Sequence, residues 1–111
     1  MTQIGFFTKE GDFYRGTITT LGICADLWLL VAPPSDADHA PDYRIHLGTE
    51  DGPDIGAGWK RVGEKAGDYV ALQIDDPFLP HPIRANLFQT TGQWESHILI
   101  WNRPSKRGTS A

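Results

Sequence analysis

Apolar side chains recur at every second position through most of this sequence, and that spacing limits the fold more than any other feature does. The clearest case is the segment 68–75, in which the alternating aliphatic residues are Val70, Leu72 and Ile74. Successive side chains of a β-strand point to opposite faces, so this spacing places the aliphatic set on one buried face. No window shows the spacing of an amphipathic helix. The sequence therefore predicts an all-β fold.

The same criterion predicts about eight strands, with turn-forming residues such as Glu10-Gly11-Asp12 between them. The expected strands are Ile4–Thr8, Phe13–Leu21, Ala25–Val31, Tyr43–Leu47, Ile55–Val62, Asp68–Asp75, Ile83–Phe88 and Glu95–Asn102. Most connections are short, whereas parallel pairing needs crossovers of about a dozen residues. We therefore expect one small antiparallel domain, a meander that closes into a barrel or a two-sheet sandwich.

Proline marks two longer connections, 32–41 and 76–82, with three prolines in each. Because proline removes a donor from a strand ladder, these segments are expected to be ordered crossovers rather than strands. A chain of 111 residues has room for one hydrophobic core. We predict an antiparallel β domain over residues 1–103 and a flexible basic tail over 104–111, which lacks an apolar anchor.

Composition suggests the compartment. The chain is 40% hydrophobic and 22% charged, which is typical of a globular protein. The longest apolar run, Leu27–Pro34, is far shorter than the roughly 20 residues that cross a bilayer, and no leader pattern opens the chain. Its one cysteine, Cys24, excludes an internal disulfide. We expect a soluble cytoplasmic protein without a membrane partner.

Charge is distributed unevenly along the chain. The formal net charge is −4, and residues 33–54 contain six acidic side chains against Arg44 alone. Nonspecific duplex binding depends on clustered lysine and arginine, so the overall acidity argues against it. Asp36, Asp38 and Asp42 lack the ligand spacing and the final glutamate of a calcium loop. The acidic stretch is therefore interpreted as a solvated surface.

Short motifs spread over about residues 3–103 resemble a known bacterial family. They are Ile4-Gly5-x-Phe7-Thr8-Lys9, Gly16-Thr17-Ile18-x-Thr20-Leu21, Ala40-Pro41-Asp42-Tyr43-Arg44, Ile55-Gly56-Ala57-Gly58-Trp59-Lys60, Leu72-x-x-Asp75-Asp76-Pro77-Phe78 and Pro82-Ile83-x-Ala85-Asn86-Leu87. The pattern is similar to that of the proteins grouped as domain of unknown function 736. Gly58 departs from it, because alanine is commoner there. The resemblance implies a small bacterial protein, often encoded on plasmids and integrative elements, and it implies no activity and no catalytic residues.

No residue pattern assembles catalytic chemistry. Cys24 and Ser96 are the conspicuous nucleophile candidates, and neither lies in a nucleophile motif. Asp75 and Asp76 are adjacent in a strand and therefore point to opposite faces, so we interpret them as turn-capping residues before Pro77. We expect no enzyme activity and no catalytic residues.

Metal and cofactor signals are equally weak. The histidines at positions 39, 46, 81 and 97 lack the short spacing of ligand pairs. The glycine-rich segment 56–61 lacks either dinucleotide fingerprint and opens no helix, so we interpret its glycines as marking a bulge or close packing. We expect no metal and no cofactor, and the sequence identifies no small-molecule ligand.

Aromatic residues of the strands, together with the basic residues beside them, are the best binding candidates, and Trp28 and Tyr69 lie on the faces opposite the aliphatic sets. The candidates are Trp28, Trp59, Lys60, Arg61, Tyr69, Arg84 and Trp101. Trp59 shares a face with Arg61, and both faces of the segment 98–101 are apolar. A sheet buried on one side cannot bury both faces, so that strand either lies at the centre of a sandwich or meets a partner.

Three hypotheses about function remain at this point. The leading one is a non-enzymatic β interaction module that forms a homo-oligomer or docks a protein partner. The alternative is single-stranded nucleic-acid binding, in which bases stack on the exposed aromatics beside Lys60 and Arg61, at about 1–3 kcal/mol per base. A small hydrolase ranks last, because a β-barrel by itself indicates no activity. In the simplest reading the aromatic rings only fill the core and a self-association surface.

Overall fold

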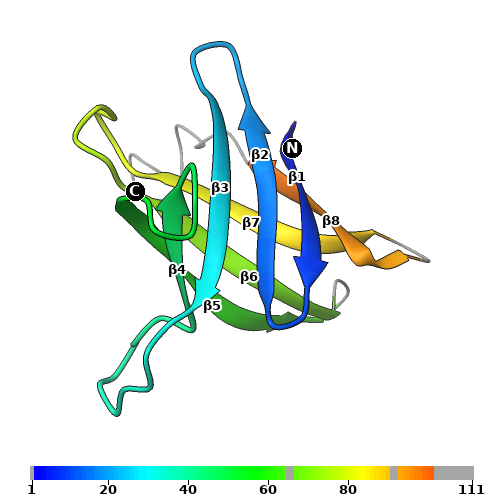
Figure 1. The fold of residues 1–111 in the computed structure, drawn as a ribbon. Helices are drawn as coiled ribbons and strands as arrows, with labels where there is room; N and C mark the ends of the chain where they lie inside the picture. Colours follow the sequence, from blue (N-terminus) through cyan, green and yellow to red (C-terminus); the bar gives the residue numbers. More distant parts are fainter. Residues whose placement is uncertain (1, 65–66, 91–92, 102–111) are drawn as a thin grey trace, which may run out of the picture.

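The computed structural model describes residues 2–64, 67–90 and 93–101, and these form eight strands closed into an antiparallel barrel (Figure 1). The strands are β1 (Thr2–Glu10), β2 (Phe13–Thr19), β3 (Cys24–Val31), β4 (Tyr43–Leu47), β5 (Asp54–Gly63), β6 (Gly67–Ile74), β7 (Ile83–Thr90) and β8 (Gln93–Trp101). The expected basic tail 104–111 lies outside the described residues.

Each strand pairs with the next along the chain, and β1 pairs with β8 to close the barrel. The prediction of an all-β antiparallel meander is confirmed, and of its two forms the chain adopts the barrel. The strand expected over Phe13–Leu21 ends at Thr19, because the Thr20 N–H donates to the Ile23 carbonyl at 2.7 Å and begins a turn. Closure leaves no open sheet edge.

The core fills the barrel with the inward-facing residues of the alternation. The largest fully buried side chains are Phe7, Ile18, Leu27, Leu29, Ile45, Leu87 and Leu99. The aliphatic set expected in segment 68–75 is buried. Val31 lies on the same face as Leu27 and Leu29 but is 54% exposed, because β3 ends there at the rim of the barrel.

Two register shifts add residues to the core. The pairing of β4 with β5 passes from Ile45–Gly56 to His46–Asp54, so Ile55 is the extra residue of a β-bulge. A similar shift between β1 and β8 makes Ile4 the extra residue. An extra residue shifts the alternation of inward and outward side chains by one position along its strand. Both isoleucines are 8% exposed and belong to the core cluster.

The glycines of β5 are required by close packing against β6. A Cβ atom at Gly56 would overlap the carbonyl oxygen of Gln73, and one at Gly58 would lie 2.8 Å from Leu72 Cδ2. The close-packing interpretation of this segment is confirmed, and the nearest atoms belong to β6.

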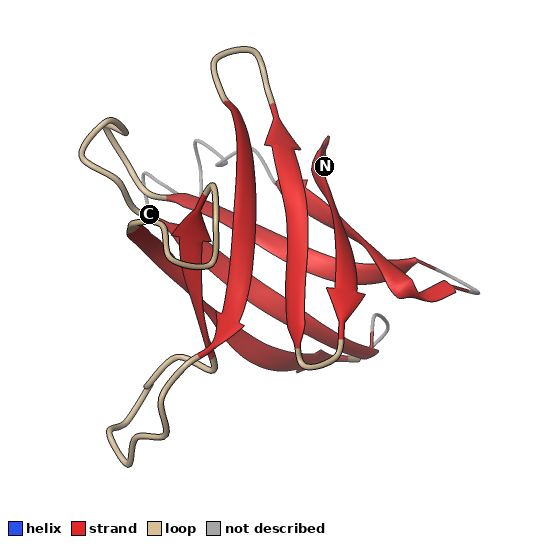
Figure 2. Ribbon diagram, in the orientation of Figure 1, coloured by secondary structure: helices blue, strands red, loops and turns tan. Residues whose placement is uncertain are grey.

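The two proline-rich connections leave opposite ends of the barrel (Figure 2). The connection between β3 and β4 leaves the end at which Lys9, Tyr14 and Tyr43 lie, and the connection between β6 and β7 leaves the other end. Among the described residues, no helix has the length and apolarity to cross a membrane.

Candidate functional site

The outer face of strands β5–β8 brings together Trp59, Arg61 and Arg84, three of the residues that the sequence singled out. Strand register places Trp59 opposite Ala71, and Arg61 opposite Tyr69. On the next strand pair, Arg84 lies opposite Gln73. Directly opposed side chains have Cβ atoms about 4.5–5.5 Å apart, so these residues form adjoining rows on one surface.

These rows surround a cavity of about 510 Å³, which we call the outer groove. Besides Trp59, Arg61 and Arg84 it is lined by His39, Ala71, Leu72, Gln73, Ala85, Asn86 and Ile100. None of these residues is acidic, although the chain carries a net charge of −4. The outer groove is therefore a locally basic surface on an acidic protein.

Hydrogen bonds from the β3–β4 connection position Trp59. Its indole Nε1 donates to the His39 carbonyl at 2.9 Å. Asp42 holds the same connection against β5, because its N–H donates to the Gly58 carbonyl and its carboxylate accepts from the Lys60 N–H at 2.8 Å. His39 itself has a φ of 62°, a left-handed conformation uncommon for residues other than glycine. The indole is fixed while its ring remains partly exposed.

An apolar row runs beside the outer groove across the outer face of four strands, β6, β7, β8 and β1. The rings of Tyr69 and Phe88 lie 5.3 Å apart between centroids. Phe88 is opposite Ile98, and Ile98 is opposite Phe6, which is 50% exposed. We call Phe6, Tyr69, Phe88 and Ile98 the apolar strip. The prediction that β8 is apolar on both faces is confirmed, because Ile98 and Ile100 lie on the outer face and Leu99 is buried.

Lys60 does not join Trp59 and Arg61, and the expected grouping needs correction. Adjacent residues of a strand point to opposite faces, so Lys60 lies on the inner face. Its Nζ atom lies 5.8 Å from the centroid of the Tyr43 ring, which is buried in the barrel. The basic side chains of the outer groove are therefore Arg61 and Arg84.

Trp28 and Trp101 also lie away from the outer groove. Trp28 is on β3, four strands from β7 in the barrel; its ring stacks on Phe13, and its Nε1 donates to the Gly48 carbonyl. Trp101 packs against the hydrophobic core on the inner face of β8 rather than on the outer face. Both rings support the barrel locally.

A second cavity, of about 690 Å³, opens at the end of the barrel where Lys60 points inward. We call it the polar mouth, and its polar lining includes Lys9, Lys60, Tyr14, Tyr43 and His97. The Tyr14 ring lies 5.7 Å from that of Tyr43 and 4.9 Å from that of His97, both in edge-on contact. No local sequence pattern indicates this group, because its members occupy inward positions of five different strands.

Burial shifts the pKa values of the groups in the polar mouth. Burial, together with the adjacent Tyr14 hydroxyl, raises the pKa of Tyr43 to about 12. Burial likewise raises the pKa of Tyr14 above its ordinary value. The pKa of His97 is lowered, chiefly by burial and further by the Lys9 ammonium, against the opposing effect of the Glu95 carbonyl. At neutral pH both tyrosines are therefore protonated and His97 is uncharged.

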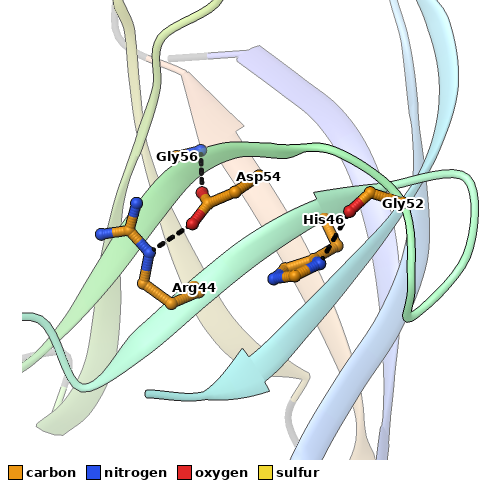
Figure 3. A network of polar contacts seen from close by, with 5 residues as sticks. All are labelled: Arg44, His46, Gly52, Asp54 and Gly56. Carbon is orange, nitrogen blue, oxygen red and sulfur yellow. Dashed lines mark hydrogen bonds and ion pairs between the residues drawn. The ribbon is translucent and has the colours of Figure 1, made fainter. Parts of the chain in front are cut away.

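The β4–β5 hairpin carries a polar network with a structural role (Figure 3). The Asp54 carboxylate accepts from Arg44 Nε at 2.8 Å and from the Gly56 N–H at 3.2 Å, beside the bulge. Burial raises the pKa of Asp54, but these bonds outweigh it and the net pKa is lowered. His46 Nδ1 lies 2.9 Å from the Gly52 carbonyl and anchors the turn. These groups stabilise the hairpin and its register.

The other chemical candidates are dispersed. Over the described part of the chain, no three His, Cys, Asp or Glu side chains converge as metal ligands would. Cys24 is exposed at the start of β3. Asp76 accepts a hydrogen bond from the Phe78 N–H at 2.9 Å, which confirms its turn-capping role.

Sequence reasoning missed the two amide side chains of the outer groove, Gln73 and Asn86. Both are polar residues at outward positions of strands, which is the ordinary composition of a solvated face. They differ from other polar residues of a solvated face only in their strand register, which places Asn86 in the row of Trp59 and Gln73 opposite Arg84.

Comparison with known proteins returns a family but no function. Neither the curated proteins nor the solved structures include a match to the chain. A family model described as a protein of unknown function, DUF736, matches residues 3–104, nearly the whole length. The all-β barrel with its basic outer groove therefore belongs to the DUF736 family.

Proposed function

We propose that this protein is a non-enzymatic binding protein that holds single-stranded nucleic acid in the outer groove. The observation that carries the proposal is the convergence of Trp59, Arg61 and Arg84 on a groove with no acidic lining residue, in a chain whose net charge is −4. Two positively charged side chains in one groove of a protein with net negative charge favour an anionic ligand there.

The side chains of the outer groove match the chemistry of a single strand. An exposed indole offers a stacking surface to any base, at about 1–3 kcal/mol per base. Arg61 and Arg84 are placed to pair with phosphate oxygens, for which a guanidinium has a matching fork of donors. The amides of Gln73 and Asn86 both donate and accept, as contacts to exposed base edges require.

The shape of the surface favours a single strand over a duplex. Duplex binders present a helix or ribbon to a groove, or a broad basic face to the backbone. Here two arginines line a single groove, and the hydrogen bond from the Trp59 indole to the His39 carbonyl holds the ring beside them. Unpaired bases can reach such a ring, whereas bases stacked within a duplex cannot.

Fluorescence anisotropy with a labelled single-stranded oligonucleotide tests the proposal. We expect saturable binding at low salt, and about two phosphate contacts predict a log–log salt slope near −1.4. Arg61→Met should weaken binding about tenfold and make that slope shallower. Arg15→Met is the matched control, because it removes the same charge from the outer face of β2, where Arg15 pairs with Glu10.

Two outcomes would overturn the proposal. One is the absence of binding at low salt by the folded protein. The other is equal weakening by Arg61→Met and Arg15→Met, because a general charge effect would then explain the binding.

A second candidate, self-association, is favoured by the apolar strip. The exposed Phe6 and the outward-facing Ile98 adjoin the Tyr69–Phe88 ring pair on strands that are already fully paired, so the barrel core does not use them. Contiguous apolar surface of this kind is typical of protein interfaces. A second copy of the chain, packed on this strip, is the occupant that we propose.

The bacterial cytoplasm is the compartment that we infer for this activity. The single cysteine, Cys24, is an exposed free thiol, which suits a compartment where thiols are kept reduced. The mobile-element setting implied by the family resemblance adds support for a nucleic-acid ligand.

A further inference from the structure

We propose that the polar mouth is a second binding site, for a small organic anion with an apolar body and a carboxylate or phosphate head. Lys60 lines only the polar mouth and Arg84 only the outer groove, on opposite faces of the barrel wall, whereas Arg61 lines both cavities. Its volume of about 690 Å³ falls within the range of about 300–1,000 Å³ that is typical of ligand sites.

Two lysines supply the charge for an anionic head. Lys9 Nζ lies 5.8 Å from the centroid of the Tyr14 ring, and Lys60 Nζ lies 5.8 Å from that of Tyr43. Within residues 2–64, 67–90 and 93–101, neither ammonium forms an ion pair. Arg61 and Asp68 also line the cavity, so its lining has three basic side chains and one acidic side chain. Asp42 is a further negative charge outside the lining, where its carboxylate accepts from the Lys60 backbone N–H.

Neutral donors lie between these charges. Tyr14 and Tyr43 both line the cavity, and each residue is 6% exposed. Both hydroxyls remain protonated at neutral pH because burial raises their pKa values. A protonated phenol donates to an oxyanion, and an oxyanion acceptor makes that hydrogen bond about twice as strong as a neutral one.

Part of the cavity lining is apolar. Val70 and Leu87 line it and are buried, and Val62 and the Tyr69 ring line it as well. Inorganic phosphate alone would leave this surface without a contact. An aromatic or aliphatic body attached to the charged head would cover it, which is why the proposal names an organic anion.

A titration followed by ¹H–¹⁵N NMR tests the proposal. Benzoate and phenyl phosphate serve as the carboxylate and phosphate probes, and benzyl alcohol serves as the neutral control of similar size. We expect saturable shifts of the amides of Lys9, Tyr14, Tyr43 and Val70 with at least one anion, at least fivefold weaker binding of benzyl alcohol, and little change at Ile23 and Ile83 of the other end.

Charge-removing variants identify the head group's contacts. Lys60→Met and Lys9→Met should each weaken binding of the better anion about fivefold, the effect of a partly exposed charge pair. Arg84→Met, which removes an equal charge from the outer groove, should leave it unchanged. Because the two lysines lie on different strands, either variant remains informative if the other fails to fold.

Three results would overturn the proposal. They are the absence of saturable shifts with both anions, equal affinity for benzyl alcohol, and shifts centred on the other end of the barrel. None of them bears on oligonucleotide binding by the outer groove, so the two proposals fail independently.

Discussion

His97 makes the stability of this protein depend on pH. It is 7% exposed, in edge-on contact with Tyr14, and burial lowers its pKa. The unfolded chain, with a histidine pKa of about 6.5, therefore takes up a proton before the folded chain does. We expect the free energy of unfolding to decrease as the pH falls from about 7 to the pKa that His97 has in the folded protein.

Urea unfolding at pH 7.5 and at pH 5.5 checks this expectation. The His97→Gln variant, which cannot titrate, should show a smaller loss of stability between the two values than the wild type. Titration of Asp54 does not affect the comparison. Its pKa is lowered, so the change in stability that it causes occurs at more acidic pH. Equal losses in the two proteins would contradict the assignment to His97.

At the residue scale, the sequence predicted which side chains share a face along one strand, but not which side chains of different strands meet. Trp59 and Arg61 share a face as expected, because two positions along one strand decide it. Lys60 was grouped with them because it is adjacent in the sequence. Alternation along the strand, however, places its side chain on the opposite face. Tyr14 and His97 meet in the polar mouth from opposite ends of the chain, a contact that no local pattern reveals.

At the scale of strands, the pairing of β5 with β6 depends on a missing side chain. The backbone of Gln73 and Ile74 occupies the space that a Cβ atom at Gly56 would need. Gly56→Ala should therefore force the strands apart and destabilise the fold by about 1–3 kcal/mol. Gly22→Ala is the matched control, because a Cβ atom there meets no atom within 4 Å. Chemical unfolding of both variants tests this, and equal stabilities would contradict it.

The strand pattern was the most predictable level of structure. All eight strands were identified, because alternation and turn residues are local signals. The bulges at Ile4 and Ile55 were not, since an extra residue is defined only against the partner strand. For the same reason the sequence left barrel and sandwich open: the deciding contact joins β1 to β8, near the two ends of the chain.

At the scale of the whole molecule, the apolar strip predicts a homo-oligomer. Light scattering on eluting protein should give a mass above the 12.3 kDa of one chain, rising with concentration in the micromolar range. Phe6→Ser should shift the protein toward monomer, because it places a polar group at the most exposed part of the strip. Phe78→Ser, which alters an equally apolar exposed ring in the β6–β7 connection, should not. A wild-type monomer at all concentrations would contradict this candidate.

The alternation of side chains along the strands places Arg84 in the outer groove and Lys60 in the polar mouth, on opposite faces of the barrel wall. The most direct measurement compares the oligonucleotide affinities of Arg84→Met and Lys60→Met, each of which removes one positive charge. The account predicts about tenfold weaker binding for Arg84→Met, which corresponds to about 1.4 kcal/mol, and wild-type affinity for Lys60→Met. Equal losses in the two variants, or a loss in Lys60→Met alone, would contradict it.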